Sequence, residues 1–353
     1  MLPLLPFSWI YAAVMRLRNM AYDQGWKKVH SAGIPVISVG NITIGGTGKT
    51  PMAEFLLRRL LEMGCRPGYL SRGYGRKSRG YFLVKRDMGG AGQFGDEAFQ
   101  VAHRFPSVPI AVCEDRVAGA RQLLAAHEID ILVMDDAFQH RRIHRSVDIV
   151  MVDVTRPPIS DRVLPMGRLR EPLSGLKRAD VIVLSKFQNP GMALQMTDDL
   201  GRRFPKAEIT RMEMKPKAII AFFPSNEAPM EITMLNGRDI VAFSGLGNNA
   251  HFRSTLEGMG AHVSSFLSFP DHHPYSEGDM EEIMLAFDHQ REIKGNLTPS
   301  VILTTEKDYF RLIGLPWMNF HASRPIYYLE VEMSPMEGWE RVDQNIRNIA
   351  RKI

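Results

Sequence analysis

The most constraining feature of this sequence is a glycine-rich turn between an apolar segment and an amphipathic one. The β-branched segment Ile37–Val39 leads to Gly45-Gly46-Thr47-Gly48-Lys49-Thr50, and a stretch with helical periodicity, Met52–Met63, follows. Glycines let backbone N–H groups converge on phosphate oxygens, and a helix N-terminus favours an anion. A lysine there neutralises phosphate charge, and a hydroxyl can ligate Mg²⁺.

The order of strand, loop, Lys-Thr and helix therefore predicts a nucleotide phosphate site. The usual motif has a glycine five residues before Gly48, where this chain has Thr43, so Gly45 and Gly46 supply the backbone freedom. The alternative is an ordinary glycine-rich turn at a strand-to-helix junction. The residues predicted to contact the nucleotide are Thr43, Ile44, Gly45, Gly46, Thr47, Gly48, Lys49 and Thr50.

Short apolar runs alternate with helical stretches along the rest of the chain. This pattern predicts βαβ units and an α/β fold with a parallel sheet, of the P-loop NTPase type. The predicted strand Ile129–Met134 contains the continuous apolar run Ile131–Met134, which is typical of a strand covered on both faces. The other predicted strands are Pro35–Val39, Gly80–Val84, Val108–Cys113, Asp148–Val152, Val181–Leu184, Asp239–Phe243, His262–Phe266, Val301–Thr304 and Ile326–Val331.

The length of 353 residues suggests about two domains. Prolines and lysines interrupt the pattern near residues 205–237, which predicts a junction there. We expect an N-terminal helix over residues 1–28, a P-loop domain over 29–215, a hinge over 216–237 and a smaller α/β domain over 238–353.

The amino terminus carries an uncharged run, LPLLPFSWIYAAVM, followed by Arg16, Arg18, Lys27 and Lys28. A spanning helix needs about 20 apolar residues, so this run is too short for a comfortable one. Aromatic residues followed by cations are typical of a helix lying in the lipid interface. A terminal helix packed on the protein's own core is the alternative.

Acidic residues follow the apolar run at Asp135-Asp136 and begin a helical stretch at Asp96-Glu97. A carboxylate at the end of a strand is how P-loop enzymes place a metal ligand, although Asp also caps turns. A carboxylate near an attacking hydroxyl would assist phosphorylation, although acidic residues also favour a first helical turn. His272 and His273 follow Asp271, and a histidine that works with a carboxylate is a more natural interpretation than a metal site. A loop histidine with no chemical role is the alternative.

Seven motifs in order give this chain a specific resemblance to a known family. It resembles the tetraacyldisaccharide 4'-kinases, the lipid A kinases, from the apolar N-terminus to about Asp308. The motifs are residues 39–51, Leu70–Arg76, Gly95–Glu97, Asp135–His140, Gly167–Pro172, Asp271–His273 and Thr304–Asp308. The resemblance implies transfer of the γ-phosphate of ATP, with Mg²⁺, to the 4'-hydroxyl of a tetraacylated glucosamine disaccharide 1-phosphate in lipid A biosynthesis. It also implies a peripheral or monotopic position at the cytoplasmic face of the inner membrane.

By matching position, the resemblance implies a role for each motif. Asp96 corresponds to the catalytic base, His272 to its partner and Arg170 to a charge-stabilising residue. The residues implied to surround the metal are Thr50, Glu97, Asp135 and Asp136. For an anionic, acylated substrate, basic stretches become candidates for its phosphate and headgroup contacts, although such stretches are often solvated surface. The substrate candidates are Arg72, Tyr74, Arg76, Arg141 and Arg142.

Composition leaves other functions open. The chain has 44 Lys and Arg against 39 Asp and Glu, a net charge of +5, which suits an anionic lipid surface or substrate. Its 2 cysteines indicate neither a disulfide framework nor a metal site. The main rival is a ParA-like membrane-associated ATPase switch, which usually has Lys where this chain has Ile44. A soluble small-molecule kinase would not need the apolar N-terminus. Basic runs without interleaved aromatics argue against nucleic acid, and no obligate protein partner is predicted.

Overall fold

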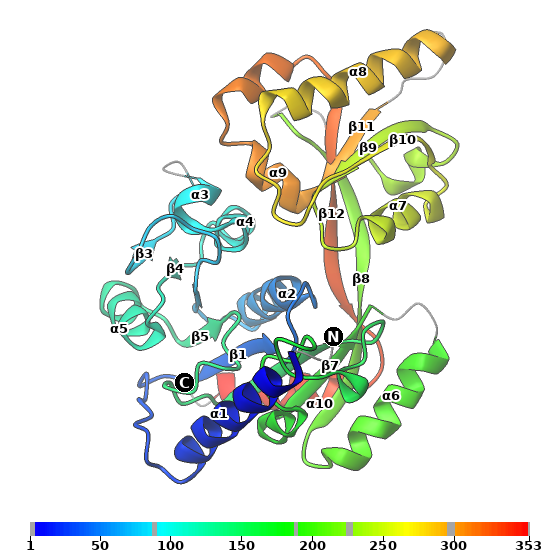
Figure 1. The fold of residues 1–353 in the computed structure, drawn as a ribbon. Helices are drawn as coiled ribbons and strands as arrows, with labels where there is room; N and C mark the ends of the chain where they lie inside the picture. The colour runs from blue at the N-terminus through cyan, green and yellow to red at the C-terminus, as the bar shows by residue number, and fades with distance from the viewer. Residues whose placement is uncertain (1–3, 87–89, 187–189, 224–228, 295–300, 352–353) are drawn as a thin grey trace. The chain divides into compact units, whose positions relative to one another are not determined.

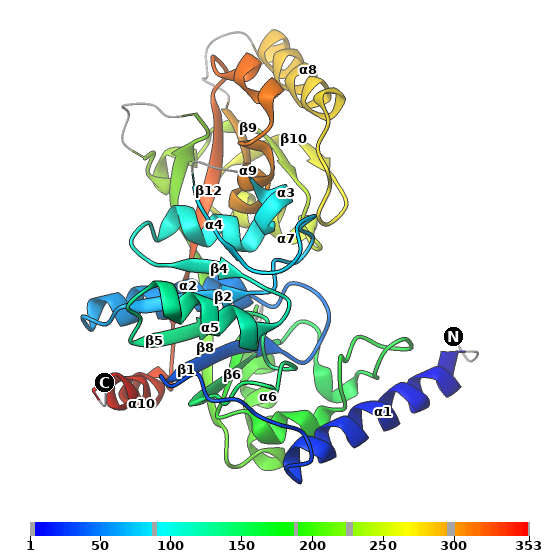
Figure 2. The ribbon, with the colours of Figure 1, turned by 90° about the vertical axis from the view of Figure 1, so that its left-hand side faces the viewer.

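The computed structural model describes residues 4–86, 90–186, 190–223, 229–294 and 301–351. The chain forms two compact units, which Figures 1 and 2 show as ribbons. Unit 1 comprises residues 1–85, 101–214 and 333–353, and unit 2 comprises residues 86–100 and 215–332.

The sheet of unit 1 places the strand before the glycine-rich loop near its centre. Its order is β3-β4-β2-β5-β1-β6-β7-β8, and every pairing is parallel except that of β3 with β4. The strands are β1 (Val36–Asn41), β2 (Pro67–Ser71), β3 (Phe82–Leu83), β4 (Ile110–Val112), β5 (Ile131–Met134), β6 (Val147–Asp153), β7 (Val181–Ser185) and β8 (Glu208–Ala221).

Helices cover the strands of unit 1 so completely that β1, β5 and β6 are buried at every residue. This accounts for the continuous apolar sequence of β5, ILVM, and for the mostly apolar sequences of β1 and β6, because neither face of these strands meets water. Helix α2 contacts β1, β2 and β5, and α5 contacts β2 and β4. The helices of unit 1 are α1 (Leu5–Asp23), α2 (Lys49–Glu62), α5 (Arg116–Ala126), α6 (Pro190–Arg203), α10 (Trp339–Ala350) and the 3₁₀ turns Pro158–Ser160 and Leu173–Arg178.

The strands of unit 2 pair in parallel in the order β10-β9-β11-β12. Alternate residues of β9 serve two cores: Ile240 and Ala242 pack with α7, and Val241 and Phe243 pack with α8. The elements are α3 (Ala91–Phe94), β9 (Asp239–Ser244), α7 (Asn249–Gly258), β10 (His262–Ser268), α8 (Glu277–Lys294), β11 (Val301–Thr305), α9 (Glu306–Leu312), β12 (Ile326–Pro335) and the 3₁₀ turns Ile232–Leu235 and Pro316–His321. Helix α4 (Asp96–Arg104) begins in unit 2 and ends in unit 1.

The predicted α/β fold built on parallel sheets is confirmed, but the units differ from the expected division. The chain passes between them four times, and β8 runs through the start of the segment expected to be a hinge. Residues 333–353 belong to unit 1, where Trp339 packs edge-on against Phe55 at 5.0 Å and Asp343 pairs with Arg59 at 2.9 Å. Strand β2 was missed because its sequence, PGYLS, contains two residues that usually weaken strands.

The N-terminal segment forms a single helix, α1, as expected. In the part of the chain that the structure describes, none of the helices has both the length and the apolar character to cross a membrane.

Candidate active site

The glycine-rich loop connects β1 to α2 in unit 1. Gly45 has φ +106° and Gly48 has φ +88°, a left-handed conformation that glycine adopts without strain. A side chain at Gly48 would also approach Met333 Cε to 3.2 Å. Because Gly48 is the residue before α2, the loop opens onto the first backbone N–H groups of that helix, which lack intrahelical acceptors.

Both ends of this loop are fastened to the sheet. Asn41 Nδ2 donates to Thr47 Oγ1 at 3.0 Å, and Ser185 Oγ donates to the Thr47 carbonyl at 3.0 Å. Thr43 forms an antiparallel bridge with Leu169. Between these fixed ends, Ile44, Gly45 and Gly46 are exposed. The predicted nucleotide residues thus form one continuous turn with buried threonines on either side of its exposed tip.

Asp135 lies directly after β5 and is fully buried. Its Oδ2 accepts hydrogen bonds from Thr50 Oγ1 at 3.0 Å and from the Tyr69 hydroxyl at 2.9 Å. The structure therefore brings the predicted metal residues Thr50 and Asp135 into contact.

Asp136, the next residue, lies between two cations. Its Oδ1 accepts from Arg170 Nη1 at 2.7 Å and lies 3.5 Å from Lys49 Nζ. Burial opposes ionisation of this carboxyl group, but Lys49 and Arg170 outweigh it and hold its pKa below the usual value. Its φ of +48° is rare for a residue with a side chain. Lys49, Arg170 and Asp136, each predicted separately, thus form one charge cluster.

Two members of this site were missed by sequence analysis. Tyr69 lies on the unrecognised strand β2, and Arg116 begins α5 with 2% of its surface exposed. Burial lowers the pKa of Arg116 to about 10, while the charge of Asp136 opposes that shift. Arg116 therefore adds a buried positive charge that interacts electrostatically with Asp136.

The contacts among Thr50, Asp135 and Asp136 suit Mg²⁺. A hydroxyl and carboxylate oxygens are hard ligands, and protein-bound Mg²⁺ usually takes one or two carboxylates plus phosphate oxygens and water. Among the described residues, no three His, Cys, Asp or Glu side chains are grouped closely enough to hold a metal by themselves.

A second cluster, in unit 2, surrounds Asp96, the first residue of α4. Asp96 Oδ2 accepts from Arg311 Nε at 2.8 Å and lies 3.2 Å from His272 Nδ1. Burial raises the pKa of this carboxyl group, but hydrogen bonding to His272 and the charge of Arg311 outweigh it and lower the pKa to about 2. Asp96 is therefore ionised at any physiological pH.

The two adjacent histidines have different surroundings. His272, at φ +58°, is the one beside Asp96, and its Nδ1 also lies 3.2 Å from Arg311 Nη2. His273 Nε2 lies 3.1 Å from Asp279 Oδ2, and its ring stacks on Phe269 at 4.8 Å. The structure thus brings the sequence-selected His272 to Asp96 and gives His273 packing partners.

Arg311 was not anticipated from the sequence, although it organises this cluster. Its side chain is 6% exposed and donates to Asp308 Oδ1 and to the Gly245 carbonyl, each at 2.8 Å. Glu97, predicted near the metal, belongs to the same unit and lies 3.5 Å from Lys307 Nζ. The only local signal was the three-residue spacing of Asp308 and Arg311, which places them on the same face of a helix, where they could form an ion pair.

The predicted substrate residues fall into two groups. Arg76, 2% exposed at its side chain, pairs with Glu114 at 2.6 Å. Arg141 pairs with Asp23 at 2.6 Å and Arg142 with Asp115 at 2.9 Å, so these guanidinium groups have partners within unit 1. The remaining two candidates, Arg72 and Tyr74, are exposed.

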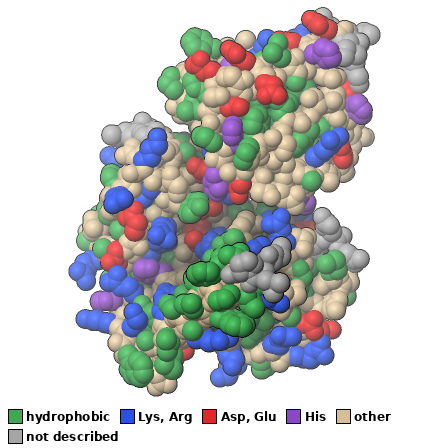
Figure 3. Space-filling view, viewed as in Figure 1, with side chains coloured by type: hydrophobic (Ala, Val, Ile, Leu, Met, Phe, Trp, Pro, Cys, Tyr) green, Lys and Arg blue, Asp and Glu red, His purple; other side chains and the backbone are tan. Residues whose placement is uncertain are grey.

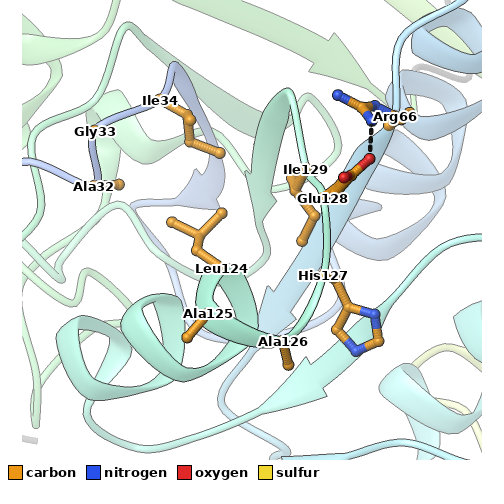
Figure 4. Close-up of a pocket in the computed structure, with 10 residues that line it drawn as sticks. All are labelled: Ala32, Gly33, Ile34, Arg66, Leu124, Ala125, Ala126, His127, Glu128 and Ile129. Atoms are coloured by element: carbon orange, nitrogen blue, oxygen red, sulfur yellow. Dashed lines mark hydrogen bonds and ion pairs between the residues drawn. The ribbon is translucent and has the colours of Figure 1, made fainter.

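A hollow of about 700 Å³ lies near the opposite ends of the strands, where residues precede β1, β2 and β5 (Figure 4). Arg66, its most prominent charged group, is paired with Glu128 and, at 2.7 Å, with Asp130. This hollow is therefore separate from the phosphate loop, and its cation is already neutralised.

Comparison with known proteins decides the family. A family model described as tetraacyldisaccharide-1-P 4'-kinase, LpxK, matches residues 1–351. The chain belongs to the LpxK family. A curated tetraacyldisaccharide 4'-kinase from Chlorobaculum tepidum is 38% identical over 98% of this chain and 97% of its own length. One from Phocaeicola vulgatus is 35% identical over 99% of this chain and 95% of its own length.

A solved LpxK structure has the same fold. The Aquifex aeolicus protein, described as an "apo" form in complex with ATP, aligns with a TM-score of 0.75 and 30% identity, covering 98% of each chain. Because the LpxK match extends over nearly the whole chain, the ParA-like alternative is not favoured.

Proposed function

We propose that this chain transfers the γ-phosphate of ATP to the 4'-hydroxyl of a tetraacylated disaccharide 1-phosphate, forming a lipid A precursor. The observation that carries the proposal is the position of Lys49 and Thr50 at the N-terminus of α2, against Asp135 and Asp136, in a member of the LpxK family. The exposed loop residues and the first N–H groups of α2 supply the phosphate contacts.

The phosphate side of the reaction depends on positioning and charge. Lys49 and Arg170 neutralise the transferred phosphoryl group, and both are already oriented by Asp136. Thr50, Asp135 and Asp136 would hold Mg²⁺. A Mg²⁺ ion held there would supply positive charge that helps to neutralise the charge developing on the phosphates. Glu97 is the further candidate ligand implied by the family resemblance.

The acceptor side depends on Asp96. A carboxylate with a pKa of about 2 is a weak base, so its main contribution is to orient the 4'-hydroxyl by accepting its hydrogen bond. In a loose phosphoryl transfer the proton leaves late, when the hydroxyl has become much more acidic, and Asp96 then accepts it. His272, beside Asp96, is placed to orient the carboxylate and to share the proton.

The lipid side of the proposal assigns α1 to the cytoplasmic face of the inner membrane. Large apolar side chains of α1, including Phe7 and Trp9 at 62% and 66% exposure, would enter the lipid interface. Exposed Arg72 and Tyr74 are the candidates for the substrate's headgroup. Attraction to anionic lipid would weaken as salt is raised, because exposed charges are screened.

The test is acceptor-dependent transfer from γ-labelled ATP. The full chain is incubated with MgATP and detergent-dispersed tetraacyl disaccharide 1-phosphate, and label is followed into the lipid. We expect labelled lipid that depends on the acceptor, and none with an acceptor blocked at its 4'-hydroxyl. Hydrolysis of ATP stimulated by vesicles, with no label in lipid, would instead support the ATPase switch.

A further inference from the structure

Helix α1 has two chemically different faces. Its outward face is apolar, and Figure 3 shows hydrophobic side chains gathered over this helix. The outward residues recur at helical spacing and are more than half exposed: Phe7 62%, Ile10 63%, Val14 56% and Leu17 59%. The opposite face includes buried Ser8, Ala12 and Met15, together with polar side chains that form hydrogen bonds with the rest of unit 1.

The polar side chains of this inner face converge on one segment, residues 163–171. Ser8 Oγ donates to the Val163 carbonyl at 3.1 Å, and the Tyr11 hydroxyl donates to the Arg170 carbonyl at 2.7 Å. Asn19 Nδ2 donates to Glu171 Oε2 at 2.7 Å. An apolar helix that only needed to cover the core would not require three directed hydrogen bonds to a single segment.

That segment runs along the first half of the phosphate loop. The Ile44 N–H donates to the Arg168 carbonyl and the Arg170 N–H to the Ile42 carbonyl, each at 2.8 Å. The Arg170 side chain then reaches Asp136, the carboxylate shared with Lys49. One continuous set of hydrogen bonds therefore links α1 to the loop and to its charge cluster.

Gln139 provides a second route to the same place. Arg18 donates to the backbone carbonyl of Gln139. The side-chain amide of Gln139 donates to Glu171 Oε1 at 3.0 Å and to the Asn41 carbonyl at 2.8 Å. Asn41 ends β1, where the loop begins. Glu171, at 0% exposure, is the buried carboxylate that both routes share.

We propose that α1 is a positioning element of the nucleotide site, whose inner face holds residues 168–171 and Gln139 where they support Arg170 and the phosphate loop. This inference rests on the proposed function. Removing the Asn19 side chain deprives the buried Glu171 carboxylate of one hydrogen-bond donor. Such a loss also weakens the positioning of the other groups that hydrogen-bond to that carboxylate. The handling of ATP therefore depends on α1 even where no lipid is present.

The test measures MgATP affinity of the full chain in the absence of lipid and detergent. The variant Tyr11→Phe/Asn19→Ala removes two inner-face hydrogen bonds, and we expect about 10-fold weaker binding. The matched control is Tyr22→Phe, since Tyr22 contacts Arg18 and Arg141 through its ring, which phenylalanine keeps. That control should bind MgATP as the unaltered chain does.

Kinetics then separate positioning from general weakening. In the lipid kinase assay, the inner-face variant should raise KM for ATP by a similar factor and leave KM for the lipid acceptor unchanged, and Asn19→Gln should recover part of the loss. If the double variant does not fold, Tyr11→Phe alone decides, with an expected loss of about 3-fold. Unchanged MgATP affinity in a folded inner-face variant overturns the inference. Failure of the unaltered chain to bind MgATP overturns the proposed function instead.

Discussion

Asp136 and Asp96 are both carboxylates kept ionised by cations, but the two sets of cations differ in how firmly they are held. The partners of Asp136 are Lys49 and Arg170, whose side chains have 10% and 26% exposure. The partner of Asp96 is Arg311, 6% exposed and tied to Asp308 and to the Gly245 carbonyl.

This difference indicates two kinds of electrostatic site. Lys49 and Arg170 can exchange a carboxylate for phosphate oxygens, because Asp136 is the anion that now balances them. Arg311 has fixed neighbours, and the hydrogen bond with His272 together with the Arg311 charge keeps the pKa of Asp96 at about 2. The first site is built to receive an anion, and the second to hold one in place.

The largest effect should come from Lys49→Ala. It removes the cation that neutralises phosphate at the exchangeable site, so we expect phosphoryl transfer to fall at least about 100-fold and MgATP affinity to fall as well. Label transfer and MgATP titration measure the two losses. Lys206→Ala is the control, because Lys206 is an exposed lysine outside the site. Full activity in Lys49→Ala would remove the phosphate loop from the mechanism.

Asp96→Asn tests the fixed site and should separate catalysis from nucleotide binding. The amide keeps the size of the side chain but cannot accept the hydroxyl proton, so we expect kcat to fall about 100-fold or more with MgATP affinity nearly unchanged. Parallel losses of kcat and MgATP affinity would mean that Asp96 serves the nucleotide, and the comparison between the two sites would collapse.

The sequence revealed the phosphate site better than the Asp96 cluster because of how each is assembled. The loop, Lys49 and Thr50 are contiguous, and their chemistry follows from the strand-loop-helix pattern. Arg311 lies 215 positions from Asp96, and nothing local marks it as a partner. The pairing of Asp96 with His272 came from family resemblance, and its catalytic role stays a prediction.

Prediction of the fold from the sequence was limited in the same way, because local patterns were visible and distant contacts were not. A continuous apolar run revealed β5, and a mostly apolar one revealed β6, whereas β2 was missed because it contains Pro67 and Gly68. A proline at the first position of a strand loses no ladder bond, so composition misled the prediction there. The return of residues 333–353 to unit 1 depends on packing of Trp339 on Phe55, a tertiary contact with no sequence period. The basic residues Arg76, Arg141 and Arg142 were predicted to contact the substrate, and nothing in the sequence indicated the acidic partners with which they pair in the structure.

His272→Ala and His273→Ala form a matched pair with a smaller expected effect. His272→Ala removes a neighbour of Asp96 and should lower kcat about 10-fold, with little change in thermal stability. His273→Ala removes a ring stacked on Phe269 and a partner of Asp279, so it should lower the unfolding temperature more than kcat. Label transfer and thermal unfolding measure both. A greater loss of kcat in His273→Ala than in His272→Ala would mean that His273, and not His272, works with Asp96.

The smallest effect, and the sharpest test of the fixed site, is the pH dependence of Arg311→Gln. In the unaltered chain Asp96 has a pKa of about 2, so the acid limb of the activity profile cannot arise from its protonation above about pH 3. Loss of the guanidinium leaves burial opposing ionisation with only His272 against it, and the pKa of Asp96 must rise.

The direction of the pKa shift decides how the stability of the fold depends on pH. A carboxyl group with a lowered folded-state pKa stabilises the fold above its unfolded pKa, and this contribution is lost as pH falls from about 4 to about 2. We expect Arg311→Gln to lose part of that acid-labile stability, because the pKa of Asp96 moves back toward its unfolded value, while kcat near pH 8 changes only a few-fold. Denaturant unfolding at a series of pH values between about 2 and 6 measures the difference, and Arg311→Lys, which keeps the charge, should reduce it. A stability profile of Arg311→Gln that is unchanged in this pH range would mean that Asp96 is held ionised by something other than Arg311.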